Sequence, residues 1–205
     1  MIITHHGGQC FKVSFGDTTL AFDPISKKSK LPSVKFGADV VFISLNHPDM
    51  NGAEEMVYGS KQPFIVDGPG EYEIGQVTAR GYGVKTKYQG EDKYTTIYRV
   101  MLEGINIVFL GALGEEEIDP KILGEFGDID ILFVPIGGGD VLDVPSASKL
   151  ATKLEARCII PMHYDGNALK AFLKEEGADV KPQEKLTIKK KDLLEMESEI
   201  VVLSS

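Results

Sequence analysis

The sequence predicts an α/β protein in which two β-sheets pack face to face with helices on the outside. Three observations predict this class. The first half of the 205-residue chain is rich in short apolar runs bounded by turn residues. The second half alternates strand-like with helix-like runs, and no low-complexity segment or linker separates the halves. We therefore expect one domain over residues 1–205, which is long enough for a sizeable core.

The first half is predicted to be mostly strands. Gly16-Asp17 and Glu103-Gly104 have the composition of hairpin turns. The spacing in Asn51-Gly52-Ala53-Glu54 is that of a capping box and predicts a short helix through about Tyr58. Lys85 to Lys93 is polar and is predicted to form a loop over one rim. The predicted strands are residues 1–4, 10–15, 18–22, 40–43, 63–66, 71–74, 76–84, 95–102 and 105–110.

The second half is predicted to alternate helices with buried strands. Asp119-Pro120 predicts a helix that ends near Gly127, since proline is favoured in a first turn. Ser146 to Glu155 and Asn167 to Glu176 each carry an apolar stripe at helical spacing. The glycines of residues 137–140 lack the lysine and hydroxyl residues of a phosphate loop, so a rim loop is expected. The predicted strands are residues 131–136, 157–160, 185–188 and 200–203.

Charge and composition exclude several classes of partner. The net charge is −9, from 22 basic and 31 acidic residues, which disfavours nucleic acid and an anionic membrane surface. Lys27-Lys28-Ser29-Lys30 and Lys189-Lys190-Lys191 are short basic clusters, interpreted as solvated loops. We expect no nucleic-acid partner and no membrane association.

Cysteine usage and the N-terminal residues predict a cytoplasmic protein. Cys10 and Cys158 each lie within an apolar run and are interpreted as small buried hydrophobes in a reducing compartment. The first eight residues have no charged and apolar signal-peptide pattern. No apolar run approaches the roughly 18 residues of a membrane span.

Two histidines occupy matching positions at predicted strand exits. Val40 to Ile43 is β-branched and aromatic without alternation, as in a strand buried on both faces, and His47 and Asp49 follow it. His163 and Asp165 follow the strand near residue 160 in the same way. Ligand sites in open α/β sheets lie past such strand ends, and these residue types bind metals or transfer protons. Asp49 can also serve as a turn residue before the next helix.

The order of several short motifs resembles the metallo-β-lactamase superfamily, in particular small bacterial proteins known as Zn-dependent hydrolases of the β-lactamase fold. The resemblance runs nearly end to end and implies a four-layered αβ/βα sandwich, in agreement with the two halves above. The motifs are Gly8 to Val13, Phe22-Asp23-Pro24, Ser44 to Asn51, Gly68 to Glu73, Leu110 to Gly114 and Ile160 to Tyr164.

The resemblance implies where metal ligands would lie. The family signature Ser/Thr-His-x-His-x-Asp-His binds two metal ions that activate a water for hydrolysis. Ser44 matches its first position, His47 its second histidine and Asp49 its aspartate, and His163 matches the final histidine ligand of the family.

Other ligand positions of the family are replaced. Leu45 stands at the first histidine of the signature and Met50 at the last. A later histidine is expected near residues 86–89, where Tyr88 is the nearest match, and the bridging aspartate position falls at Ala112. Leucine has no donor atom and a thioether is a weak ligand for Zn²⁺, so a dinuclear site is not expected. The cofactor prediction is therefore none, or a single zinc or similar divalent ion on His47, Asp49 and His163.

Our first hypothesis is a degenerate member of the fold that acts as a binding or assembly protein without dinuclear metal hydrolysis. Its pocket would be lined by His47, Asp49, His163, Tyr88 and Tyr164. The occupant would be a small-molecule ligand or a protein partner, and a homodimer is expected from base rates alone.

Two enzymatic alternatives stay open. One is a metal-dependent hydrolase of esters or phosphodiesters with a single rearranged site, to which His5 or His6 could add a ligand, although adjacent strand residues point to opposite faces. The other is metal-free acid/base catalysis by His47 and Asp49. Substrates in this superfamily are diverse, so the resemblance does not specify one.

Overall fold

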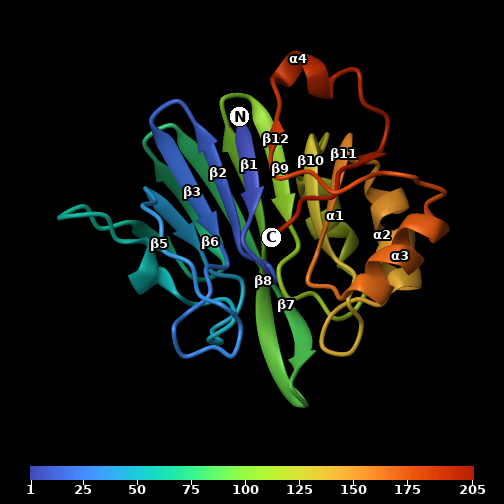
Figure 1. The fold of residues 1–205 in the computed structure, drawn as a ribbon, viewed down its shortest axis with the longest axis horizontal. Coiled ribbons are helices and arrows are strands. Elements are labelled where there is room, and N and C mark those ends of the chain that lie inside the picture. The colour runs from blue at the N-terminus through green and yellow to red at the C-terminus, as the bar shows by residue number, and fades with distance from the viewer.

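A computed structural model describes residues 1–205 and contains two mixed β-sheets that face each other (Figure 1). The first sheet has six strands in the order β12-β1-β2-β3-β4-β5. Neighbours β1, β2 and β3 pair antiparallel, whereas β3, β4 and β5 are parallel. These strands are β1 (Ile2–His5), β2 (Phe11–Phe15), β3 (Thr18–Phe22), β4 (Val40–Phe42), β5 (Phe64–Val66) and β12 (Leu186–Thr187).

The second sheet has seven strands in the order β13-β11-β10-β9-β8-β7-β6. The strands from β6 to β9 are antiparallel, and β9, β10, β11 and β13 are parallel. Buried parallel strands are uniformly apolar, which explains the continuous apolar runs in this part of the chain. The strands are β6 (Gly70–Ile74), β7 (Val77–Tyr88), β8 (Glu91–Leu102), β9 (Ile105–Phe109), β10 (Ile131–Pro135), β11 (Cys158–Met162) and β13 (Glu199–Ile200).

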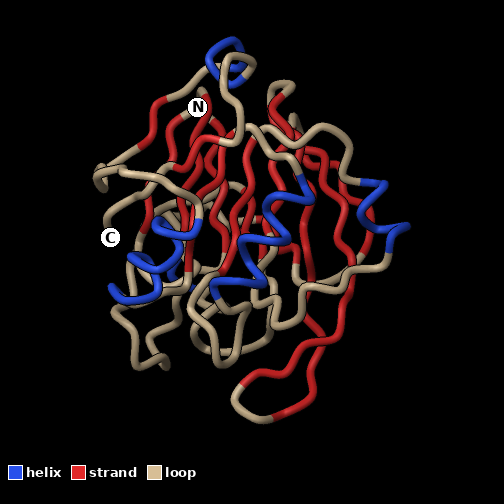
Figure 2. The backbone as a smooth tube through the Cα atoms, turned by 90° about the vertical axis from the view of Figure 1, so that its right-hand side faces the viewer, coloured by secondary structure: helices blue, strands red, loops and turns tan.

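The three longer α-helices all lie outside the seven-stranded sheet, on the right in Figure 1 and towards the viewer in Figure 2. They are α1 (Pro120–Glu125), α2 (Val144–Leu154) and α3 (Gly166–Glu175), and α4 (Lys190–Leu193) is a single turn near the top of Figure 1. None of the helices is long and apolar enough to cross a bilayer. The outer side of the six-stranded sheet is covered over β3 and β4 by a loop near Phe36 and by the 3₁₀ helix η1 (Ala53–Met56).

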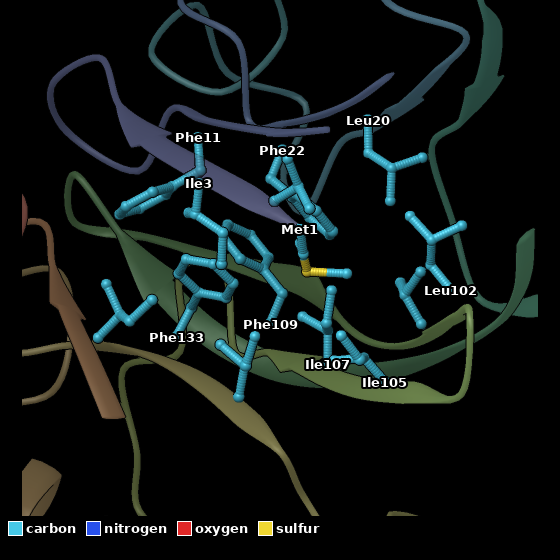
Figure 3. Packing of buried hydrophobic residues seen from close by; sticks show 14 of the residues in the cluster. Met1, Ile3, Phe11, Leu20, Phe22, Leu102, Ile105, Ile107, Phe109 and Phe133 are labelled. Atoms are coloured by element: carbon cyan, nitrogen blue, oxygen red, sulfur yellow. The ribbon is translucent and has the colours of Figure 1, made fainter. Parts of the chain in front are cut away.

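The main core fills the space between the sheets. It contains 27 buried residues, and aromatic rings from both sheets meet at its centre (Figure 3). Phe11 of β2 lies 4.6 Å from Phe133 of β10, and Phe22 of β3 lies 5.0 Å from Phe109 of β9, measured between ring centroids. This contact holds the two sheets in fixed relation, and with them the strand ends that carry the candidate site.

The predicted loop at Lys85 to Lys93 is wrong, because β7 and β8 continue through it as a hairpin. Their register runs without a break from Val77 opposite Leu102 to Tyr88 opposite Glu91. Gln89 and Gly90 form the turn, both with positive φ, as tight hairpin turns require. The hairpin extends beyond the rest of the molecule at the bottom of Figures 1 and 2. Its polar sequence suits a ribbon that is held by its backbone ladder and lies largely in water.

The predicted helix after Asn51 is only a short 3₁₀ turn, η1, and Asn51 does not cap it. The N-cap residue is Gly52, which makes no side-chain cap, and Asn51 donates instead to Asn46 Oδ1 at 2.9 Å. A Cβ on Gly52 would lie 2.5 Å from the backbone of Ile25, so close packing against that segment decides the residue here.

Candidate functional site

The candidate site lies past the carboxyl ends of strands from both sheets. The segment after β4 carries Leu45, His47, Asp49 and Met50, and His163 follows β11 directly. In each sheet, neighbouring parallel strands have their carboxyl ends at the same edge. These two edges lie at the same end of the sandwich, so the segments that follow β4 and β11 come close together.

The three residues that the resemblance places at ligand positions come together as one apolar cluster. Leu45, Met50 and Ala112 pack with Tyr88 and Val141, and each of the five is at most 4% exposed. Apolar and aromatic atoms therefore fill the end of the sandwich where the family pattern would place metal ligands. We call these five residues the plug.

The polar residues next to the plug form hydrogen bonds and close contacts with one another. Asp49 Oδ2 lies 3.4 Å from His47 Nδ1, which also accepts a hydrogen bond from the Asp49 backbone at 3.2 Å. Ser29 donates to Asp49 Oδ1, and the Tyr88 hydroxyl donates to Asp49 Oδ2 at 3.4 Å. Burial and the nearby Asp49 carboxylate raise the pKa of Tyr88, so its hydroxyl stays protonated as a donor. Its ring centroid lies 5.0 Å from that of His47.

The backbone of His163 lies against Gly8 and Gly137, and its side chain contacts Gln9. Its amide donates to the Gly8 carbonyl at 2.9 Å, and a Cβ on Gly137 would lie 2.2 Å from the His163 oxygen. The Gln9 amide nitrogen lies 2.8 Å from His163 Nδ1. Burial lowers the pKa of His163, against the opposing effect of the Asp49 and Asp140 carboxylates. A neutral imidazole is the form expected at pH 7.

Asp23 anchors the segment that leads into the site. Its side chain is fully buried and accepts from the Ser44 amide and the Ser44 hydroxyl, each at 2.6 Å. Burial raises the pKa of Asp23 to about 8, while the two bonds from Ser44 act in the opposite direction. Asp23 thereby ties the end of β3 to the residue that precedes the replaced ligand Leu45.

Asp23, Gln9 and Ser29 are site residues that sequence reasoning missed. Asp23 and Gln9 lie within motifs that supported the resemblance, but no periodicity or spacing in the chain marked their partners. Ser29 sits in a lysine-rich loop whose composition suggested only solvation.

Three residues proposed for the pocket or the metal lie elsewhere. Tyr164 lies with His5 in a separate pocket of about 260 Å³ near the C-terminus. The His5 ring nitrogens face the Leu203 and Gly8 carbonyls, each at 3.2 Å. His6 stacks at 5.0 Å on Phe36, so neither histidine supplies the missing ligand.

The donors that are present do not fit a metal ion. No group of three or more His, Cys, Asp or Glu side chains gathers in an arrangement that could hold one. His47, Asp49 and His163 are the only matches to the family ligands, and Tyr88 lies against the rings of both histidines, at centroid distances of 5.0 and 6.3 Å. Catalytic zinc needs about three protein ligands converging at about 2 Å.

Comparison with known proteins gives both sequence and structural relatives. The family model for the β-lactamase superfamily domain matches residues 2–163. A UPF0173 metal-dependent hydrolase from Listeria innocua is 28% identical in an alignment 196 residues long, and the match covers 80% of this chain and 86% of that protein. A second, from Bacillus licheniformis, is 27% identical in an alignment 194 residues long, with 80% of this chain and 85% of that protein covered.

Solved structures also include relatives from this superfamily. A candidate Zn-dependent hydrolase of the metallo-β-lactamase superfamily from Thermotoga maritima is 28% identical, with a TM-score of 0.77 over 99% of this chain and 98% of its own. Igni18, a metallo hydrolase from Ignicoccus hospitalis, shares the fold at 16% identity, with a TM-score of 0.65 over 92% and 99% of the chains. The chain belongs to the β-lactamase superfamily.

Proposed function

We propose that this chain is a non-hydrolytic member of the superfamily, which keeps the fold for binding or assembly. The observation that carries the proposal is the plug. Leu45, Met50 and Ala112 replace ligands of the family pattern and also pack against one another and Tyr88. Burying each of the larger side chains stabilises the fold by about 1.5–3 kcal/mol.

The remaining polar groups support the same proposal. A buried imidazole or carboxylate without a metal carries a desolvation cost unless it is hydrogen-bonded. Asp49 accepts from Ser29 and Tyr88, and the Gln9 amide nitrogen contacts His163 Nδ1, so each group has a protein partner. Binding of a ligand or partner protein at this end of the sandwich, in the cytoplasm, is the role we propose.

The alternative is a hydrolase with one metal ion. The observation that favours it is the contact between His47 and Asp49, at 3.4 Å, because both side chains are ligand types. The relatives from Listeria and Bacillus are named metal-dependent hydrolases. Metal content separates the two functions.

The test uses untagged protein, incubated with Zn²⁺ or Mn²⁺, dialysed and measured by elemental analysis. The proposal predicts well under about 0.1 ion per chain, since a retained ion needs about three converging ligands. It also predicts that the melting temperatures of the wild type and of His47→Ala/His163→Ala respond equally to added Zn²⁺. About one ion per chain, lost in the double variant together with a zinc-dependent rise in melting temperature, would refute it.

The matched control is His6→Ala, which removes a histidine that stacks on Phe36 away from the plug. His6→Ala should leave both the metal content and the response of the melting temperature to Zn²⁺ unchanged. If His6→Ala lowers zinc retention as much as the double variant does, His6 also holds the ion, as the hydrolase alternative allows, and the proposal is refuted.

A further inference from the structure

The outer face of the six-stranded sheet has an open groove over β1 and β2. Ile2 and Thr4 of β1 and Lys12 and Ser14 of β2 form its floor, and residues 34–36 form a wall. Its volume is about 650 Å³. The neighbouring strands β3 and β4 are covered by η1 and the loop near Phe36, and the α-helices lie on the other sheet (Figure 1). The groove is thus distinct from the plug, which lies at the strand ends.

The groove is cationic although the protein is acidic. Its charged lining residues are Lys12 and Lys35, with His6 beside them and no carboxylate. The segment from Pro24 to Ala38, which supplies the wall, has four lysines and no acidic residue, in a chain of net charge −9. Neither Lys12 nor Lys35 belongs to any of the ion pairs. Two unneutralised lysines therefore face one concave surface.

The cations border an apolar and aromatic surface. Ile2 is 43% exposed on β1 and lines the groove. Phe36 is half-buried, with the His6 ring stacked on it at 5.0 Å and Lys12 Nζ at 5.4 Å from its centroid. Burial and the charges of His5 and Lys12 lower the pKa of His6, as expected in a region of positive potential. Apolar walls with few charged groups are typical of small-molecule sites, whose volumes run from about 300 to 1,000 Å³.

We propose that this groove binds a small amphiphilic carboxylate. Its carboxylate would lie between Lys12 and Lys35, and its aryl or alkyl part would cover Ile2 and Phe36. Charge complementarity indicates an anionic head group, of which a carboxylate is the simplest, because the lining offers two point charges and no competing acid. The exposed Ile2 and the half-buried Phe36 indicate the apolar part.

The test is a titration of the full chain with 4-phenylbutyrate, followed by two-dimensional ¹H–¹⁵N NMR. We expect saturable shifts confined to amides of β1, β2 and residues 34–36, with a Kd of about 1 mM or tighter. The uncharged 4-phenylbutanol and the cationic 4-phenylbutylamine should bind at least about tenfold more weakly, because they lack the head group. Absent or unsaturable shifts, or equal binding of the alcohol, would overturn the proposal. Tighter binding of 4-phenylbutyl phosphate would overturn the assignment to a carboxylate.

Charge reversal locates the site. Lys12→Glu/Lys35→Glu should weaken 4-phenylbutyrate binding at least about tenfold. The control Lys170→Glu/Lys174→Glu makes the same change in net charge on exposed lysines of α3, and it should bind within about twofold of wild type. Equal losses in both variants would mean a non-specific charge effect and refute the groove. If the reversal variant does not fold, Lys12→Gln/Lys35→Gln gives the same comparison.

Discussion

Met50→His tests the physical role of the plug, because it restores a family ligand type at a fully buried position. Met50 is 0% exposed within the five-residue plug. Removing a buried methionine side chain costs about 1.5–3 kcal/mol. Burying an imidazole without a hydrogen-bond partner adds about 1–3 kcal/mol. The free energy of unfolding should fall by about 2.5–6 kcal/mol, within the range of severe core substitutions.

The assay is urea unfolding in EDTA at pH 7.5, followed by far-ultraviolet circular dichroism. Met50→Leu is the matched control, since it keeps the volume and the apolar character and should cost less than about 1.5 kcal/mol. If Met50→His loses less than about 1 kcal/mol, the pocket accepts an imidazole without metal. That result would refute the argument that close apolar packing keeps ligand residues out of this site.

Three further predictions concern the plug and its neighbours. Asp23→Asn should flatten the pH dependence of the free energy of unfolding. In the folded protein the pKa of the Asp23 carboxyl is about 8, which exceeds its value in the unfolded chain, so the folded state holds a proton that the unfolded state releases. Wild-type stability should therefore fall as pH rises from about 5 to 8, by at most about 1.4 kcal/mol per pH unit, in urea titrations across that range. Gly137→Ala should cost about 1–3 kcal/mol in urea unfolding, because its Cβ would lie 2.2 Å from the His163 carbonyl oxygen. Tyr88→Phe should cost only about 0.5–1.5 kcal/mol in the same assay, since it removes one hydrogen bond to Asp49 and keeps the ring in the plug.

Each of these has an outcome that contradicts it. A pH slope in Asp23→Asn equal to that of the wild type would show that another group titrates. Gly124→Ala is the steric control for Gly137→Ala, because nothing lies within 4 Å of a Cβ there; equal losses in both would refute the steric argument. A loss in Tyr88→Phe as large as the roughly 3–5 kcal/mol expected for truncating a buried aromatic residue to alanine would mean that the hydroxyl, not the ring, carries the stability.

The sequence predicted most of the local structure because that structure depends on neighbouring residues. Thr18–Phe22 forms the strand that its short apolar run and the Gly16-Asp17 turn indicate. Asp119 caps α1 through its side chain, with Pro120 in the first turn. The Lys85 to Lys93 hairpin escaped prediction because most of its residues are polar, although the alternate residues Thr86 and Tyr88 are buried.

For the site, the comparison of Leu45, Met50 and Ala112 with the family signature, one residue at a time, predicts changed ligand positions, and this stays a prediction. Only the tertiary structure decided that these three pack with Tyr88 and Val141 as one plug. The five residues come from segments that are distant in the chain and that meet only because two sheets align the ends of their strands. Side-chain packing between such segments depends on three-dimensional shape, which the order of residues along a chain does not display.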